Sequence, residues 1–496
     1  MEGITEPPNS PGRSTRTRIA LALLVLLLGG CAGIPQEIAE SEKGATCAQQ
    51  FQQLDERVEA GSTRDAGDTR IDGFPWLRIN RFLASRLPAE TDEQAWEAWL
   101  EALRQLDLEG RRYELANLHG IEPEHPQLQA MLAPLEDCGR ELNQKILAST
   151  GLRGKLTEQA RVPDDYRRSQ RWLGAYPISR WFVLAGVARL HADQKDWLGQ
   201  EHEAGPGALA LRYAGTGLPA PETTIQDIPR DPLGRPKPTP AQERELFRQH
   251  APVWEIHTES RADRIGQPRW RGNPRPEVDT DQPVEYRFLS RAEFDGEAVL
   301  QLNYMVWLPE RPPREGWLDR LLAGHMDGLI WRITLDGEGR VLAGESLHAC
   351  GCYYMVFPGS GLTPRGDRPG GEPVFMGPPL PERPDSEQLV LVREPSSHYL
   401  LGIDTIRRER EREPLAVRPA DSLRSLPDAD GRRSLYGTDG IVPGTQRPER
   451  WLLWPMGIRS AGAMRQPGRH AIAFAGIRHF DDPDLLDNHF RRKDPE

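Results

Sequence analysis

The fold is decided by residues 329–347, which read LIWRITL, then DGEG, then RVLAGESL. The two outer stretches are rich in apolar and β-branched side chains, and the acidic and glycine residues between them are typical of a tight hairpin turn. The pattern predicts two antiparallel strands, at 329–335 and 340–347. Upstream, residues 302–308 (LNYMVWL) are apolar enough to form a central strand that is buried on both faces.

Further short apolar runs, separated by glycine and proline clusters, extend this β-rich region. They predict strands at 284–290, 298–308, 353–357, 388–393, 399–404, 451–454 and 471–475. We therefore expect a mainly antiparallel β domain over residues 243–496. Two segments, 359–385 and 407–433, are rich in glycine and proline or in charge, and are predicted to be loop insertions.

The first half of the chain shows helical periodicity instead. Apolar side chains recur on one face at residues 96–106 and again at 128–138, and residues 172–197 predict a buried helix. Thr91 and Gln94 fit a capping box that would start the first of these helices. No strand is expected here. The sequence thus predicts an α+β fold: a helical domain at 47–202, a proline-rich linker at 203–242, and the β domain.

The N-terminus has the order of a secretory signal. Three arginines within residues 13–18 precede an apolar run at 19–28. Ten residues form a helix of about 15 Å, about half the hydrocarbon thickness of a bilayer, so this run is too short to span a membrane. The pattern is typical of a signal peptide that is removed after export.

The run ends in LGGC at residues 28–31, which resembles the lipobox of bacterial lipoproteins. The resemblance implies that residues 1–30 are the signal peptide. It also implies that Cys31 is the lipidated (palmitate-bearing) first residue and that 31–46 form a tether. Ala32 stands where an inner-membrane retention signal usually has aspartate, so the resemblance favours the outer membrane, with the protein facing the periplasm.

Charge and motifs exclude several functional classes. The formal net charge of −11 gives the chain no general electrostatic reason to bind nucleic acid or to lie flat on an anionic membrane. The sequence contains no phosphate-binding loop, no H-E-x-x-H zinc helix and no G-x-S-x-G nucleophile elbow. Common nucleotide-dependent, metalloprotease and serine-hydrolase functions therefore lose support.

Five cysteines occur in the chain. With Cys31 lipidated, four remain in an oxidising compartment, and they allow three disulfide pairings. We favour Cys47–Cys138, because both residues fall in the helical region. A Cys350–Cys352 bond would be strained.

A cluster of polar residues surrounds the predicted hairpin. Its turn would bring His325 or Asp327 close to His348 and to Cys350 and Cys352. Imidazole and thiolate ligands suit zinc or copper, and these five residues are the candidate metal ligands. The Cys-Gly-Cys triplet also resembles small dithiol redox motifs. A structural disulfide or a pair of buried thiols is the favoured alternative to both.

Other polar residues receive simpler interpretations. His479 would join the cluster only if the last strand lay beside the hairpin. Solvent-exposed positions are expected for four further residues: His257, His398, Asp279 and Asp281. Trp331, Trp451 and Trp454 are expected to pack in the core, with a carbohydrate platform of exposed tryptophans as the alternative.

The sequence leaves two classes of function open. The first is a cell-envelope lipoprotein that binds or assembles with an envelope protein or a carbohydrate. The second is a metal-binding or redox enzyme with the His/Asp/Cys cluster as its site. Convergence of His325, His348 and a cysteine sulfur in one accessible cleft would favour the second class.

Overall fold

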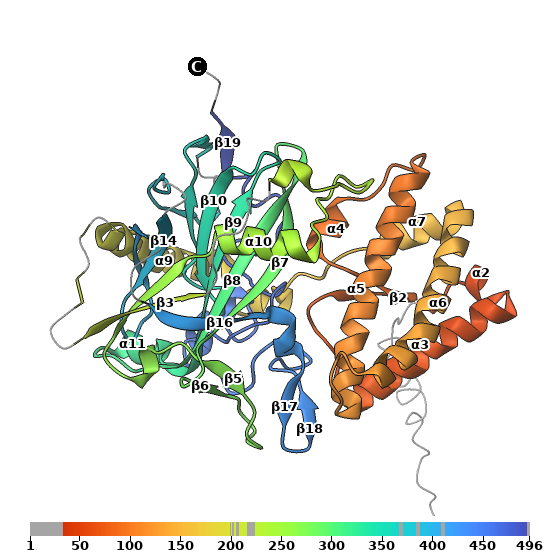
Figure 1. Cartoon of the computed structure of the whole chain (residues 1–496), viewed down its shortest axis with the longest axis horizontal. Helices are drawn as coiled ribbons and strands as arrows, with labels where there is room; N and C mark the ends of the chain where they lie inside the picture. The colour runs from red at the N-terminus through yellow and green to blue at the C-terminus, as the bar shows by residue number, and fades with distance from the viewer. Residues whose placement is uncertain are drawn as a thin grey trace, which may run out of the picture.

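The computed structural model describes residues 33–198, 200, 203–204, 208–215, 224–366, 371–382, 387–407 and 412–493. The lipobox and Cys31 lie outside the described residues, so the membrane anchor stays a prediction. Figure 1 shows the first long helices gathered at one end of the molecule and a large sheet at the other. This arrangement confirms the α+β fold.

The helical part is built from a few long helices and several short ones. They are α2 (Gln36–Ala39), α3 (Glu42–Ala60), α4 (Arg81–Ser85), α5 (Glu93–His119), α6 (Pro126–Ala148) and α7 (Thr150–Gln159). Asp92, and not Thr91, caps α5, because its side chain accepts a hydrogen bond from the backbone N–H of Ala95. The predicted disulfide is confirmed: Cys47 of α3 and Cys138 of α6 are bonded, with Cα atoms 5.3 Å apart.

A hairpin inside the helical part contradicts the expectation that it holds no strand. Strands β1 (Thr69–Ile71) and β2 (Phe74–Ile79) pair antiparallel. Five of the six residues of β2 are buried, so the strand lacks the apolar–polar alternation by which a half-exposed strand is detected. Trp76 packs in the helical core, and its indole N–H donates to Asn143 of α6.

The second part is organised by one mixed sheet of eleven strands. Its spatial order is β13-β11-β10-β9-β8-β7-β16-β3-β4-β14-β15. In chain order the strands are β3 (Leu209–Gly215), β4 (Val253–Thr258), β7 (Val284–Phe294), β8 (Glu297–Arg311), β9 (Gly324–Leu335), β10 (Val341–His348), β11 (Met355–Pro358), β13 (Phe375–Met376), β14 (Glu387–Arg393), β15 (Leu400–Arg407) and β16 (Glu413–Pro419). The run from β7 to β11 is antiparallel throughout, as predicted.

Smaller elements decorate this sheet. The helical segments are α8 (Arg168–Leu173), α9 (Tyr176–Leu198), η1 (Ile225–Asp227), α10 (Pro240–Gln249), η2 (Arg261–Asp263), α11 (Trp317–Leu322), η3 (Ala420–Arg424), α12 (Arg450–Leu453) and η4 (Trp454–Met456). Three short antiparallel strand pairs are β5 (Gln267–Arg269) with β6 (Glu277–Asp279), β12 (Leu362–Pro364) with β19 (Phe490–Arg492), and β17 (Leu426–Asp428) with β18 (Gly431–Arg433).

Strand β8 is the centre of the β core. Leu302, Tyr304 and Val306 pack into one apolar cluster, whereas Met305 and Trp307 pack into another on the opposite face. All five side chains are fully buried. The prediction of a strand buried on both faces is confirmed.

Two predicted connections turn out to contain sheet strands. The proposed linker 203–242 includes β3, and the proposed loop insertion 407–433 includes β16, which pairs with both β3 and β7 in parallel. The insertion 359–385 holds β12 and the edge strand β13. These strands were missed because their partners are distant in sequence, so no local hairpin signal marks them.

Three further predictions fail in α9 and near the end of the chain. Helix α9 was expected to be buried, yet only Val187 and Gln194 of its residues are. Residues 451–454 were expected to form a strand with core tryptophans, but they belong to α12 and η4 and leave Trp451 71% exposed. Residues 471–475 form no strand either, apart from one isolated bridge at Ala471. Among the described helices, none is long and apolar enough to cross a membrane.

The two parts of the molecule are joined by a buried arginine. Arg424 of η3 donates to Asp65 at 2.9 Å and to Glu109 of α5 at 2.6 Å. Its guanidinium also stacks over the Tyr113 ring at 4.3 Å. The helical part is therefore held against the sheet by ion pairs as well as by apolar contacts.

Candidate functional site

The predicted hairpin brings Asp327 and His348 together, as expected. Strand β9 supplies Asp327 and the end of β10 supplies His348, whose Cα pairs with that of Leu329. The Nδ1 atom of His348 lies 3.2 Å from Oδ1 of Asp327, and both side chains are buried. A carboxylate only accepts hydrogen bonds, so Nδ1 carries the proton in this pair.

His398, expected to be solvated, is a full member of this cluster. It precedes β15 and is completely buried, with its Nδ1 atom 2.9 Å from Oδ2 of Asp327. Its Nε2 atom lies 3.4 Å from Oδ1 of Asp263, which follows β4. The result is a buried chain of alternating acid and base, Asp263–His398–Asp327–His348. Position 398 was missed because a lone histidine between two strands carries no local signal.

Three buried arginines surround the chain of acids and bases. Arg447 donates to Oδ1 of Asp327 at 3.2 Å. Arg311 donates to the Tyr399 hydroxyl at 2.8 Å, and Arg393 donates to the Ser346 hydroxyl at 2.9 Å. Burial lowers the pKa of Arg393 to about 9. The region therefore has several positive charges with little solvent to screen them.

The pKa values of the two histidines are shifted in opposite directions. Burial lowers the pKa of His348 from 6.5 to about 4, against the attraction of Asp327, so His348 is neutral at pH 7. Its Nε2 atom is buried and has no hydrogen-bond partner among the described residues. For His398 burial acts in the same direction, but hydrogen bonds to Asp263 and Asp327 prevail and raise its pKa.

Asp327 stays ionised in this setting. Burial alone would raise its pKa, but the neighbouring His348 and Arg447, together with its hydrogen bonds, lower it well below 3.8. It can therefore hold the proton of His348 on Nδ1 and leave a bare lone pair on Nε2. That arrangement is typical of a base or of a metal ligand.

Cys350 and Cys352 lie in the turn that follows β10, and both are free thiols in the structure. The backbone N–H of Cys352 donates to Sγ of Cys350 at 3.3 Å. The turn is closed by His348, whose N–H donates to the Cys352 carbonyl at 3.0 Å and whose carbonyl accepts from Gly351 at 2.8 Å. Gly351 has φ +89°, and a Cβ there would stand 2.4 Å from the Ala471 carbonyl oxygen.

The two thiols have opposite tendencies to ionise. Burial opposes ionisation of Cys350, but a hydrogen bond from the Cys352 thiol and the charge of Arg447 lower its pKa below 9.0. The same hydrogen bond and burial raise the pKa of Cys352 well above that value. Cys350 is thus the more acidic thiol of the pair, and Cys352 is the hydrogen-bond donor.

Backbone strain concentrates around these side chains. Eight non-glycine residues in the described chain have positive φ, and four of them belong to this region: Met326 (53°), Tyr353 (60°), Ser396 (65°) and His398 (58°). Such conformations are costly for ordinary residues and tend to gather at functional sites. Met326 directly precedes Asp327, and Tyr353 directly follows Cys352. His398 belongs to the cluster, and the N–H of Ser396 donates to Asp263 at 2.6 Å.

A cavity beside α9 reaches Cys352, and Cys350 does not line it. This cavity of about 40 Å³ is lined by Gly351, Cys352 and Tyr353 on one side and by Leu190, His191 and Gln194 of α9 on the other. Cys350 itself is buried at 3% exposure and Cys352 at 8%. Because only two residues of α9 are buried, a local displacement of this helix would open the cavity at moderate cost.

The structure does not bring all five candidate metal ligands together. His325 directs its Nε2 atom to the Pro276 carbonyl oxygen at 2.5 Å, apart from the His348 cluster. His479 lies against Asp165 and Asp482 and does not join it. His470, in contrast, lies behind the cysteine turn, with Nε2 3.1 Å from the Ala349 carbonyl oxygen. Among the described residues, no three His, Cys, Asp or Glu side chains are arranged to hold a metal ion.

Four other residues can be compared with their sequence interpretations. His257 and Asp279 were expected to be solvated, and this is wrong because they are buried at 3% and 9% exposure. Trp331 packs in the core as expected, with no exposed surface, whereas Trp454 is 37% exposed.

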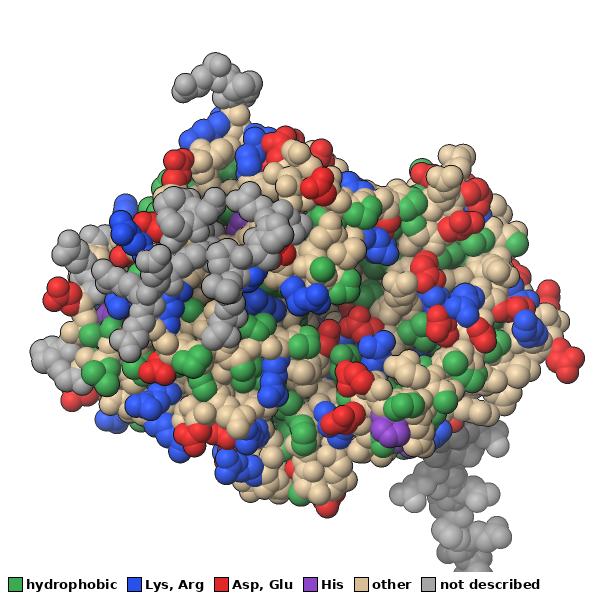
Figure 2. All heavy atoms as spheres, in the orientation of Figure 1, with side chains coloured by type: hydrophobic (Ala, Val, Ile, Leu, Met, Phe, Trp, Pro, Cys, Tyr) green, Lys and Arg blue, Asp and Glu red, His purple; other side chains and the backbone are tan. Residues whose placement is uncertain are grey.

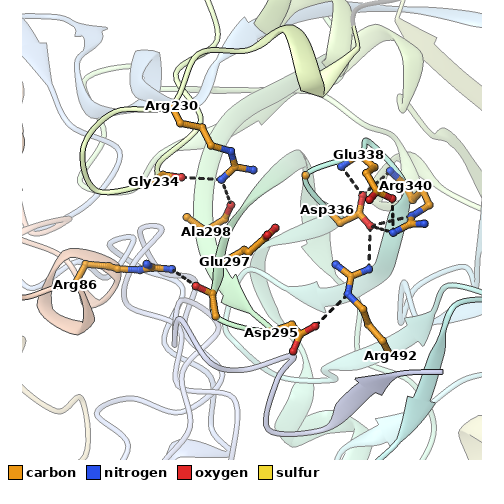
Figure 3. A pocket seen from close by; sticks show the side chains of 12 residues that line it. Arg86, Arg230, Gly234, Asp295, Glu297, Ala298, Asp336, Glu338, Arg340 and Arg492 are labelled. Atoms are coloured by element: carbon orange, nitrogen blue, oxygen red, sulfur yellow. Dashed lines mark hydrogen bonds and ion pairs between the residues drawn. The ribbon is translucent and has the colours of Figure 1, made fainter. Parts of the chain in front are cut away.

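A larger cleft lies at the other end of the β9–β10 hairpin. It has a volume of about 700 Å³ and is formed by the β7–β8 and β9–β10 turns together with Arg86, Arg230 and Arg492. Figure 3 shows Arg492 bridging Asp295 and Asp336, and Arg230 bound to backbone carbonyls of Gly234 and Ala298. Glu297 lies between these two groups. The cleft therefore presents both signs of charge.

Comparison of the chain with protein-family models, with curated proteins and with solved structures returned no match. Geometry and chemistry alone therefore guide the assignment of a function.

Proposed function

We propose that the protein is a lipid-anchored protein of the outer membrane, facing the periplasm, and that its β-rich part exchanges disulfides through Cys350 and Cys352. The observation that best supports this chemistry is the pair of free thiols in one tight turn, where Sγ of Cys350 accepts hydrogen bonds from the backbone N–H and the thiol of Cys352. The other two described cysteines of the chain form a disulfide. A dithiol kept beside buried arginines is suited to reaction, because the thiolate is the nucleophile in disulfide exchange.

The exchange would proceed in two balanced steps. The Cys350 thiolate attacks one sulfur of a partner disulfide, which forms a mixed disulfide and releases the other sulfur as a thiolate. That thiolate takes up the proton of Cys352. The Cys352 thiolate then attacks Sγ of Cys350, which releases the second partner thiol and leaves a Cys350–Cys352 disulfide. Two electrons pass from the dithiol to the partner, and the reverse sequence oxidises a partner dithiol.

The surrounding residues would act by position and charge. Asp327 holds the His348 ring, and the backbone of His348 closes the cysteine turn. Arg447 supports the Cys350 thiolate. His348 and Asp327 are therefore positioning residues for the dithiol, and Cys350 is its catalytic residue.

Trapping of the mixed disulfide tests this proposal. The Cys352→Ser variant should accumulate a covalent adduct with oxidised glutathione at residue 350, because no second thiol remains to release it. The Cys350→Ser variant is the matched control and should form at most a slow adduct, since the Cys352 thiol is the less acidic of the two. Equal adduct yields from the two variants, or none from either, would contradict the assignment of Cys350 as the attacking thiol.

A binding role for the charged cleft is the second candidate, because its volume of about 700 Å³ falls in the range of small-ligand sites. Carboxylates and guanidinium groups side by side favour a zwitterionic peptide over a neutral sugar. Short zwitterionic peptides should raise the melting temperature of the protein, and the Glu297→Gln variant should lose that shift. An equal shift with maltose, or in the variant, would contradict a charge-selective cleft.

A further inference from the structure

Two segments of the chain lack acidic residues entirely. Residues 166–192 contain five arginines and residues 450–480 contain another five, and neither segment has an Asp or Glu. In a chain with a net charge of −11, these are strongly positive stretches. Their spacing in the sequence, more than 250 residues apart, gives no hint that they meet.

The structure packs the two segments together. The N–H of Arg167 donates to the Gly457 carbonyl at 2.8 Å, and Tyr166 forms a β-bridge with Ile458. The side chain of Arg171 donates to the Met456 carbonyl at 2.9 Å. Helices α8 and α9 therefore form one surface with α12 and η4, which we call the α8–α12 surface.

The α8–α12 surface is unusually apolar for an exposed region. Thirteen large hydrophobic side chains are exposed in the described chain, and nine of them lie in these two segments. These nine include Trp172 (82%), Phe182 (78%), Trp451 (71%), Ile178 (67%), Leu173 (67%) and Trp181 (59%). Soluble proteins seldom expose contiguous apolar patches of this kind unless the patch contacts something.

Arginines on this surface stack on aromatic rings. Arg180 lies 4.9 Å from the centre of the Trp181 ring, and Arg450 lies 4.8 Å from that of Trp451. Arg171 lies 4.5 Å from both Tyr166 and Tyr176. None of these three arginines forms an ion pair with a carboxylate in the described part of the chain. Arg459 and Arg469, by contrast, pair with Asp439 and Asp165.

This charge pattern is local. The face of the molecule shown in Figure 2 carries acidic and basic side chains interspersed. The positive charge of the two acid-free segments is thus a property of this surface and not of the protein as a whole.

We propose that the α8–α12 surface docks onto an anionic lipid bilayer. Tryptophan and arginine prefer the headgroup level of a membrane, where the apolar ring enters the acyl boundary and the cation meets lipid phosphates. Arginines are attracted to an anionic membrane surface, and several of them together with exposed aromatic rings suffice for peripheral binding.

Charge and side-chain chemistry disfavour a second copy of the chain or a carbohydrate as the partner of this surface. A second copy of the chain would set two positive surfaces against each other. A carbohydrate is held by hydrogen-bonding groups beside the aromatic rings, whereas this surface adds aliphatic Leu173 and Ile178. Its carboxylates, Asp193 and Asp196, lie in the last turns of α9. The proposal depends neither on the lipid at Cys31 nor on the dithiol.

Vesicle flotation tests the proposal with a chain that cannot carry the lipid. The chain from residue 31 onward, with Cys31→Ser, retains every described residue and is mixed with vesicles of phosphatidylcholine alone or with phosphatidylglycerol added. We expect it to float only with the anionic vesicles, and less so as salt rises. The triple variant Trp172→Ser/Phe182→Ser/Trp451→Ser should bind the anionic vesicles at least about tenfold more weakly, because three large rings are no longer buried in the lipid.

The matched control changes exposed apolar residues elsewhere. Leu87 and Val417 are 42% and 44% exposed and lie outside the two segments. The Leu87→Ser/Val417→Ser variant should float like the parent chain, and thermal unfolding should show all three proteins folded. Absence of flotation, or equal flotation of the triple variant, overturns the proposal. The proposal is also overturned if the parent chain does not float but instead self-associates or binds a polysaccharide, and the triple variant loses that interaction.

Discussion

The buried state of His348 predicts a specific change in the pH dependence of stability. An unfolded histidine binds a proton near pH 6.5, whereas His348 in the folded protein does so only at about 4. Between these values the unfolded state binds more protons, so this group makes the free energy of unfolding fall as the pH falls. From pH 7 to pH 5 the loss amounts to about 2 kcal/mol.

Other groups act in the opposite direction, so the prediction concerns a difference between variants. Burial raises the pKa of Asp68 to about 7 and that of Asp481 to about 6. In the folded protein these carboxyls keep protons that the unfolded state loses, which stabilises the fold as the pH falls. His398, whose pKa is raised, adds less than about 1 kcal/mol in the same direction. The pH dependence of the whole chain therefore sums opposing contributions, and only the difference between variants isolates that of His348.

Urea unfolding at pH 5, 6 and 7 isolates the His348 contribution. The His348→Gln variant has no proton to bind at this position. When the pH falls from 7 to 5, its free energy of unfolding should therefore rise by about 2 kcal/mol relative to that of the parent chain. This comparison holds whatever the absolute stability of the variant. The His119→Gln variant, changed at an exposed histidine, serves as the control and should show the parent profile. An identical profile for His348→Gln and the parent would refute the claim that His348 is buried and neutral.

Three further outcomes are expected. Gly351→Ala should lower the free energy of unfolding by about 2–4 kcal/mol in urea titrations, because φ is positive there and the new Cβ would stand 2.4 Å from the Ala471 carbonyl oxygen. Gly361→Ala, whose Cβ would meet open space, should leave the free energy of unfolding unchanged. Arg424→Ala should lose about 3 kcal/mol, since it leaves Asp65 buried without its partner, whereas Arg140→Ala on the surface should leave the urea midpoint unchanged. Cys31→Ser in the full chain should abolish incorporation of labelled palmitate, and continued labelling would contradict lipidation at that residue.

The parts of the fold that follow from local sequence were predictable. The 329–347 hairpin, the doubly buried β8 and the Cys47–Cys138 pair each rest on a strong apolar pattern or on a simple count of cysteines. The contact between Asp327 and His348 followed from the hairpin alone. Its geometry is fixed by a four-residue turn and needs no knowledge of the rest of the chain.

The remainder of the site depends on contacts between distant segments. His398 and Arg447 reach Asp327 from two separate segments, and Asp263 of η2 reaches His398 from a third. No local pattern distinguishes these three residues from solvated ones. The same reason explains why β3 and β16 were missed, since parallel pairing leaves no turn signal between partners.

Helix α9 shows the opposite error. Its apolar composition suggested burial, but composition does not tell which apolar helix is covered, and α9 leaves Trp181 and Phe182 exposed. Residues 451–454 misled in the same way, because aromatic residues are typical of strands as well as of exposed binding surfaces. These two errors concern the surface that we propose to dock onto a membrane.

The most direct test of the disulfide-exchange proposal is a redox titration of the folded protein. The chain is equilibrated with glutathione buffers of increasing reducing power, free thiols are blocked, and peptide masses report each cysteine pair. The proposal predicts that Cys350 and Cys352 interconvert between dithiol and disulfide at ratios where Cys47–Cys138 stays oxidised. A Cys350–Cys352 pair that stays in one state at every ratio, and changes only when the protein unfolds, would contradict it.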